Sequence, residues 1–152
     1  MKNGVSTGIK RVNLICSRDT ADGVYPPLIL GLQAARAGAE TVIFFTFDGL
    51  NVIRKGGAKK IKYYPKGLLG AIPGLPAMMA RMLSGLAESR AGVPDIETLL
   101  EMCQLEGVKF HACLMTMQMM NLSPSDLIEG VEVADAAGYM QKALVSDVNL
   151  FI

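Results

Sequence analysis

The sequence contains no tryptophan, a single histidine and only three cysteines among its 152 residues. The cysteines, Cys16, Cys103 and Cys113, are widely spaced and form no Cys-x-x-Cys pair. An odd number of cysteines at wide spacing does not build a disulfide framework, and one histidine without a cysteine pair does not build a zinc site. The sequence therefore predicts free thiols and no metal centre, and no motif in it calls for a cofactor.

Strong charge and membrane-spanning runs are also missing. The net charge is +1, and basic residues are not interleaved with aromatic ones, so we expect no nucleic-acid partner. The first ten residues lack the apolar stretch of a signal peptide, which predicts a cytoplasmic location. Residues 67–87 are apolar, but Pro73, Pro76 and Arg81 argue against a membrane span. We expect this segment at a subunit contact or another interface rather than inside a bilayer.

Strand and helix patterns alternate along the chain. The predicted strands cover 11–17, 40–47, 108–112, 131–133 and 147–152. The main predicted helices cover 25–37, 77–89, 94–106 and 134–144. Shorter helices are predicted over 50–54 and 123–128, and another begins at 114. Pro26 and Pro27 are placed in the first turn of the first helix. This order predicts an α/β fold, a three-layer parallel sheet with helices on both faces.

The length predicts one domain over 1–152, with a long Gly-, Pro- and Met-rich insertion at about 56–90. Residues 56–76 read as a loop, and a loop of this length inside a domain is functional or mobile. The loop could cover the reactive site or dock a partner, or its lysines could simply be solvated. The hydrophobic fraction is 51%, which is high for a monomer and predicts a homo-oligomer interface.

The most informative stretch changes its period at Cys113. Before it, Val108, Phe110 and Ala112 alternate with polar residues, and after it come straight-chain helix formers. Cys113 is thus predicted at the carboxyl end of a strand and at the start of a helix. In open α/β sheets reactive groups collect at that edge, and a helix N-terminus favours a thiolate. We predict that Cys113 is a reactive sulfur, held by the backbone N–H groups of Leu114 and Met115.

Other residues have two interpretations at this point. His111 lies two residues before Cys113, on the same strand face, and either polarises the sulfur or makes an ordinary polar contact. Cys16 ends the first strand and is a second thiol or a core residue. Cys103 lies on an apolar helix face, which favours core packing. The methionines after Cys113 favour helix packing over Cu(I) binding.

Four stretches of the chain resemble the DsrE/DsrF-like family, in its single-chain branch of sulfur carriers and sulfurtransferase-like proteins. They are Thr41–Asn51, the Met-rich segment around Met78–Leu86, Gly107–Met117, and the tail Val148–Ile152. The motif Cys-x-Met-Thr-Met, from Cys113 to Met117, is the most specific. Two positions depart from the family pattern: Arg18 and Asn121 stand where many relatives have glycine.

The resemblance implies a flavodoxin-like fold, homo-oligomers, and sulfur transfer through a persulfide on Cys113. Cys16 matches a further thiol that some members carry. Implied partners are sulfur donor or acceptor proteins such as rhodanese-like or TusA-like carriers. Two other readings stay open: a non-catalytic binding or assembly subunit with a structural Cys113, and a small-ligand binder, although no phosphate-binding fingerprint is present.

Overall fold

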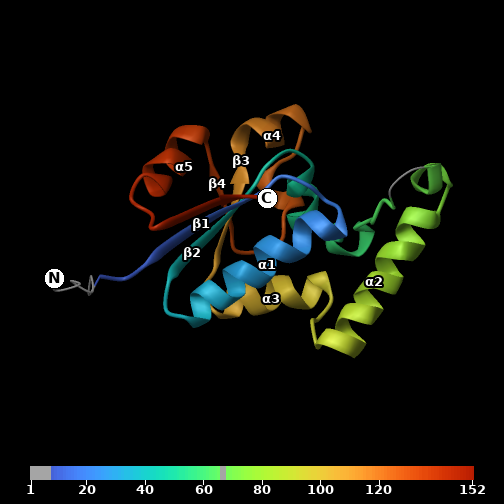
Figure 1. Ribbon diagram of the computed structural model, residues 1–152. Coiled ribbons are helices and arrows are strands. Elements are labelled where there is room, and N and C mark those ends of the chain that lie inside the picture. The colour runs from blue at the N-terminus through green and yellow to red at the C-terminus, as the bar shows by residue number, and fades with distance from the viewer. Residues whose placement is uncertain (1–7, 66–67) are drawn as a thin grey trace.

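The computed structural model describes residues 8–65 and 68–152 and contains a five-stranded parallel sheet (Figure 1). Its strands lie side by side in the order β4-β3-β2-β1-β5. Their bounds are β1 Arg11–Cys16, β2 Glu40–Phe45, β3 Lys109–Cys113, β4 Val131–Ala134 and β5 Val148–Phe151. Every pairing is parallel, and helices lie on both faces of the sheet, which confirms the predicted α/β class.

One face of the sheet is covered by two helices, α1 (Ala21–Arg36) and α3 (Ile96–Leu105), which pack side by side. The main core lies between them and the inward side chains of the central strands. Phe45 and Phe110, both fully buried or nearly so, meet there edge to face with ring centroids 5.4 Å apart. This continuous apolar layer is what the central parallel strands of an α/β protein require.

The first helix begins four residues before its predicted start. The prediction placed Pro26 in the first turn, but α1 begins at Ala21, so both prolines lie inside the helix. The reason is tertiary: the Ala21 N–H, which a helix start leaves unpaired, donates to the carbonyl of Lys62 at 2.8 Å. A segment forty residues away in sequence thus stabilises an extra helical turn.

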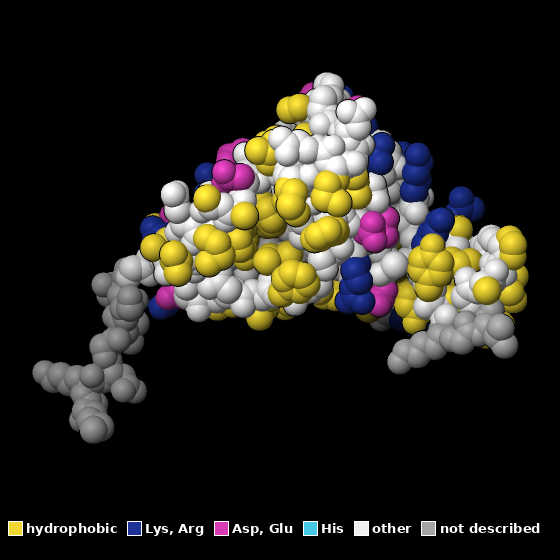
Figure 2. Space-filling view, turned by 90° about the horizontal axis from the view of Figure 1, so that it is seen from above, with side chains coloured by type: hydrophobic (Ala, Val, Ile, Leu, Met, Phe, Trp, Pro, Cys, Tyr) yellow, Lys and Arg dark blue, Asp and Glu magenta, His cyan; other side chains and the backbone are white. Residues whose placement is uncertain are grey.

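The opposite face is covered by two short helices, α4 (Leu114–Met119) and α5 (Ala136–Ala143). No residue of α5 is buried, although Tyr139 rests against Phe44 of β2 with ring centroids 4.8 Å apart. Hydrophobic side chains gather on this face in the space-filling view (Figure 2). The exposed ones on α4, α5, β5 and the adjoining turns are Phe47, Leu114, Met115, Met119, Met140, Leu144, Val145 and Phe151. We call this set the apolar face.

The segment between β2 and α3 includes the predicted insertion, and its described residues contain one long helix and three short helical turns. The helix α2 (Leu75–Ala91) confirms the predicted helix, extends it by two residues at each end, and projects away from the sheet (Figure 1). The 3-10 turns are η1 (Phe47–Ile53), η2 (Ala58–Lys60) and η3 (Leu68–Ala71). The predicted loop 56–76 is therefore partly helical, and its residues 66–67 lie outside the described residues. A fourth turn, η4 (Pro124–Asp126), replaces the short helix predicted over 123–128.

Candidate functional site

Cys113 occupies the junction that its sequence context predicts. It is the last residue of β3 and the N-cap of α4, with extended backbone angles (φ −67°, ψ 115°). Its residue surface is 5% exposed, so the sulfur lies just beneath the surface at the carboxyl edge of the sheet. Such a position combines shelter from water with the free N–H groups of a helix start.

Burial and nearby hydrogen-bond donors shift the pKa of the Cys113 thiol in opposite directions. Burial alone would raise the pKa of the Cys113 thiol, but hydrogen bonds from the hydroxyl and N–H of Thr116, the hydroxyl of Thr46 and the N–H of Met115 outweigh it. The net effect is a pKa below the usual thiol value. Donors favour the charged form of a group that accepts their hydrogen bonds, so the site stabilises a thiolate.

The two threonines come from different elements and hold each other in place. Thr46 follows β2, Thr116 belongs to α4, and their hydroxyl oxygens lie 3.2 Å apart. The Phe47 N–H donates to the Thr116 hydroxyl oxygen at 3.1 Å. Since that hydroxyl already accepts a bond from the backbone, its own proton is available to the sulfur or to Thr46. Neither threonine was predicted as a site residue, although Thr116 stands three residues after the cap, where a side chain reaches back.

The backbone beside this pair adopts an uncommon conformation. Phe47 has φ +47°, in the left-handed region that non-glycine residues rarely enter, and half of its surface is exposed. This bend starts η1 directly after β2 and aims the Phe47 N–H at Thr116. Backbone conformations of this kind cluster at functional sites.

The helix start contributes one of the two amides that the sequence analysis named. The N–H groups of Thr116 and Met115 both lower the pKa of the Cys113 thiol, whereas the N–H of Leu114 is not among the main causes of that shift. The N–H groups of the second and third helical positions are the ones that a cap side chain reaches. The Leu114 side chain is exposed and belongs to the apolar face.

His111 points to the face that carries α4 and α5, and its contacts are with neighbours other than the sulfur. Its Nε2 atom lies 3.2 Å from Lys142 Nζ on α5 and 3.3 Å from Glu132 Oε2 on β4. Burial, followed by the positive charge of Lys142, lowers the pKa of the imidazole. Its Nδ1 atom is buried and has no hydrogen-bond partner in the described part of the chain.

The other two cysteines lie in the main core. Cys16 is paired in register with Phe45, which is paired with Ala112, so its side chain points to the α1 face while Cys113 points to the opposite one. Its thiol donates to the carbonyl of Arg18 at 3.5 Å, and burial raises its pKa to about 12. Cys103 is fully buried on α3, as predicted, with a pKa likewise raised to about 12 by burial.

Two further properties concern the described residues as a whole. Over 8–65 and 68–152, no three His, Cys, Asp or Glu side chains come together as a metal site. Within the same ranges no helix is long and apolar enough to cross a bilayer.

Comparison with known proteins places this chain in a family. The DsrE/DsrF/DrsH-like family matches residues 9–151, nearly the whole chain. The chain belongs to this family. A relative from Allochromatium vinosum, named sulfur carrier protein DsrE2, is 35% identical and the match covers 94% of this chain and 98% of the relative. The YrkE protein of Bacillus subtilis is 29% identical over 94% of this chain and 97% of its own length.

Solved structures show the family fold at low sequence identity. The ychN protein of E. coli superposes with a TM-score of 0.64 at 14% identity, covering 95% of this chain and all of that one. Protein MTH1491 of Methanobacterium thermoautotrophicum superposes with a TM-score of 0.55 at 15% identity, covering 93% and 98% of the two chains. At these identities the likeness concerns the fold alone.

One departure from the family pattern has a direct structural explanation. Asn121 has φ +51°, and the Leu122 N–H next to it donates to the carbonyl of Met117, which closes the end of α4. Glycine is favoured at such a position, and asparagine is among the few other residues that adopt it readily. Asn121 therefore preserves the turn that ends the helix behind Cys113.

Proposed function

We propose that this protein carries sulfane sulfur as a persulfide on Cys113 in cytoplasmic sulfur trafficking. The observation that supports it best is the donor set of Thr46, Met115 and Thr116, which lowers the pKa of a thiol at the carboxyl edge of the sheet. The 35% identity to a protein named as a sulfur carrier supports the same role. Whether the transfer is catalytic, as in a sulfurtransferase, depends on how fast the sulfur leaves again.

The chemistry needs no oxidant. The Cys113 thiolate attacks the outer sulfur of a donor persulfide R–S–SH, an S–S bond forms to Cys113, and the donor leaves as the thiolate R–S⁻. In the second step an acceptor thiolate attacks the outer sulfur of Cys113–S–SH and expels the Cys113 thiolate. Each step forms one S–S bond and breaks one, so electrons balance without a cofactor.

The same donors serve both ends of this cycle. The hydroxyls of Thr46 and Thr116 and the N–H of Met115 stabilise the Cys113 thiolate before attack and after release. The outer sulfur extends about 2 Å beyond the Cys113 sulfur, the length of an S–S bond. Since Leu114 and Met115 next to it are exposed, this extension brings the transferable sulfur toward a partner.

Rhodanese-like or TusA-like carriers are the partners we propose as sulfur donor or acceptor. They must approach the carboxyl edge of β3, where the exposed side chains of Phe47, Leu114 and Met115 flank the sulfur. We further propose that the protein forms homo-oligomers through part of the apolar face. Exposed apolar patches of this kind mark protein contacts in soluble proteins.

The second candidate is a non-catalytic assembly subunit with a structural Cys113. The low exposure of Cys113 and the extent of the apolar face favour it. In that case the thiol is a small buried side chain and the surface is the functional feature. A secondary role for Cys16 remains a proposal too; its burial and its raised pKa make it the weaker nucleophile of the two.

Intact mass spectrometry separates the two candidates. The protein is incubated with polysulfide, desalted and weighed, alongside the variants Cys113→Ser, Cys16→Ser and Cys103→Ser. We expect an adduct of about 32 Da, one sulfur atom, in the wild type and in the Cys16 and Cys103 variants, but not in Cys113→Ser. The absence of an adduct in the wild type contradicts the carrier function and leaves the assembly role. An adduct that persists in Cys113→Ser contradicts the assignment to Cys113 and moves the role to another cysteine.

A further inference from the structure

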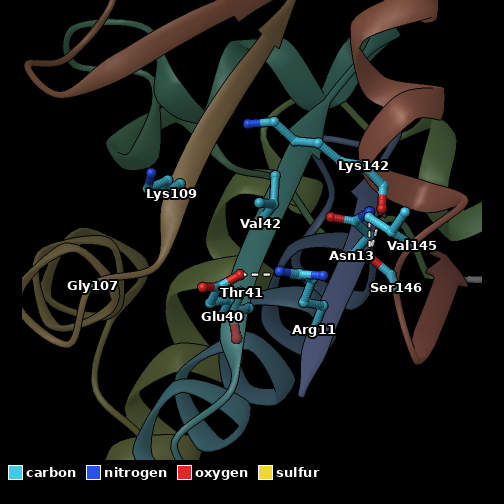
Figure 3. A pocket seen from close by; sticks show the side chains of 10 residues that line it. All are labelled: Arg11, Asn13, Glu40, Thr41, Val42, Gly107, Lys109, Lys142, Val145 and Ser146. Carbon is cyan, nitrogen blue, oxygen red and sulfur yellow. Dashed lines mark hydrogen bonds and ion pairs between the residues drawn. The ribbon is translucent and has the colours of Figure 1, made fainter. Parts of the chain in front are cut away.

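A cavity of about 290 Å³ lies between α5 and the amino ends of β1, β2 and β3 (Figure 3). It lies at the edge of the sheet opposite to the carboxyl edge, where Cys113 ends β3. Its wall includes Arg11, Asn13, Val42, Lys109 and Lys142. The sulfur chemistry proposed above uses none of these residues.

The cavity has an excess of positive charge. Of its three cationic side chains, Arg11 is paired with the Glu40 carboxylate at 2.9 Å. Lys109 and Lys142 have no acidic partner within 8–65 and 68–152. Figure 3 shows the Lys142 side chain extending across Val42 toward the side on which Lys109 lies. An anion between the two ammonium groups would neutralise positive charge that no acidic side chain of the described residues compensates.

Asn13 presents a fixed acceptor to the same cavity. Its side-chain nitrogen donates to the Ser146 hydroxyl at 2.9 Å, and that hydroxyl donates to the carbonyl of Lys142 at 2.8 Å. Because the hydroxyl proton is used, the amide must turn its NH₂ toward Ser146, and its oxygen then faces the cavity (Figure 3). Asn13 is only 2% exposed, and its oxygen accepts no hydrogen bond from the described residues. This oxygen is not among the fully buried atoms, so it is open to a donor group of a ligand in the cavity.

We propose that this cavity binds a small organic oxyanion, a phosphate ester or carboxylate, whose charge contacts Lys109 and Lys142 and whose hydroxyl or amine donates to Asn13. The Val42 and Val145 side chains provide the apolar part of the wall, and the volume exceeds what a bare inorganic anion fills. The site is independent of the sulfur carrier function.

The pKa of His111, the one histidine of the chain, should respond to this binding. The Nε2 atom of His111 lies 3.2 Å from Lys142 Nζ, and the charge of Lys142 contributes to the lowered pKa of the imidazole. An anion that neutralises Lys142 removes part of that effect, so the His111 pKa rises. Because the sequence has one histidine, its ring signals in an NMR spectrum are assigned without ambiguity.

The experiment titrates the full-length protein with glycerol 3-phosphate, malate and inorganic phosphate, and follows the His111 ring signals and the heat of binding. We expect saturable binding of glycerol 3-phosphate or malate with a rise of the His111 pKa. We expect binding about five-fold weaker for inorganic phosphate, which has no carbon chain to carry a hydroxyl from the lysines to Asn13. Equal affinity for all three anions, or no saturation by any, overturns the proposal.

Two variants locate the site. Lys109→Gln, at an exposed position, should weaken binding about ten-fold through loss of a charged hydrogen bond. Lys60→Gln removes a lysine of the same charge from a turn that does not line the cavity, and should leave binding unchanged. Equal loss in both variants would show general attraction to a basic surface and would overturn the assignment.

Discussion

The hydroxyl oxygens of Thr46 and Thr116 lie 3.2 Å apart although 70 residues separate them in the chain. Both hydroxyls also lower the pKa of the Cys113 thiol, and the effect of Thr116 is the larger of the two. The pair therefore connects the end of β2 to the first turn of α4 and contributes to the lowered pKa of the Cys113 thiol. Its removal is the most direct test of how the site works.

Replacing Thr116 by valine keeps the shape of the side chain and removes its hydroxyl. The pKa of Cys113 should rise, because the strongest side-chain donor to the thiolate is lost. We expect alkylation by iodoacetamide at pH 7 to slow by about five-fold, since one hydrogen bond contributes about 1 kcal/mol. Alkylation rates over a range of pH give the pKa directly.

The matched control is Thr116→Ser, which restores the hydroxyl and should return the rate to nearly the wild-type value. Thr41→Ser serves as a second control, because Thr41 is a buried threonine of β2 that bonds only to a nearby carbonyl. If Thr116→Val and Thr116→Ser react at the same rate, the hydroxyl has no role in activating the thiol.

The three thiols should differ sharply in reactivity in the native protein. Burial raises the pKa of both Cys16 and Cys103 to about 12, whereas hydrogen bonds lower that of Cys113. We expect one equivalent of Ellman's reagent to react rapidly at pH 8, and two more only after denaturation. Peptide mapping should find the fast label on Cys113; a fast label on Cys16 would be evidence for the second-thiol role.

Stability should fall as the pH drops below about 6.5, the usual pKa of a histidine. The charged groups around His111 are Lys142 on α5, Glu132 on β4 and Lys109 on its own strand. Burial and the positive charges of the two lysines lower the pKa of His111 by more than the Glu132 carboxylate raises it. The unfolded chain therefore binds a proton at higher pH than the folded one, so the contribution is complete above pH 6.5 and is lost as the pH falls toward the folded pKa.

Urea unfolding at pH 7.5 and pH 5.5 measures this dependence. His111→Asn removes the titrating group, so the difference in unfolding free energy between the two pH values should shrink. An unchanged difference would assign the pH dependence to other groups.

The turn after α4 should tolerate glycine but not alanine at position 121. Asn121 has φ +51°, a conformation that costs most side chains about 1 kcal/mol or more. Asn121→Gly should therefore be nearly neutral in urea unfolding, and Asn121→Ala should be destabilising by about 1 kcal/mol. Equal stability of the two variants would show that the helix end relaxes instead.

The apolar face should control the oligomeric state. Leu144 and Phe151 are 78% and 72% exposed there, and a glutamate at either place would be buried in an interface without a partner. In light scattering coupled to size exclusion we expect Leu144→Glu and Phe151→Glu to yield smaller species than the wild type.

Leu105→Glu is the control for this experiment, because Leu105 is 87% exposed at the end of α3 on the other side of the sheet. It should leave the mass unchanged. A wild-type protein that is already monomeric, or a mass that falls equally in all three variants, would contradict an interface on the apolar face.

Local features were predictable from the sequence because they depend on near neighbours. The change of period at Cys113 reports a strand followed by a helix, and the structure has that junction at the same residue. The alternation around Phe110 and the apolar face of α3 likewise identify core residues such as Cys103. The strand–helix order yields the parallel sheet, since parallel neighbours require a crossover connection.

Features that depend on register and packing were decided only by the tertiary structure. Thr46 reaches Cys113 because Phe45 pairs with Ala112, and no local pattern encodes that pairing. The early start of α1 depends on the carbonyl of Lys62, and the basic cavity exists because the end of α5 and the turn after it lie near the amino ends of three strands. The sequence alone thus determined which sulfur stands at a strand end, whereas folding decided which donors surround it, because contacts between distant segments arise only when the sheet assembles.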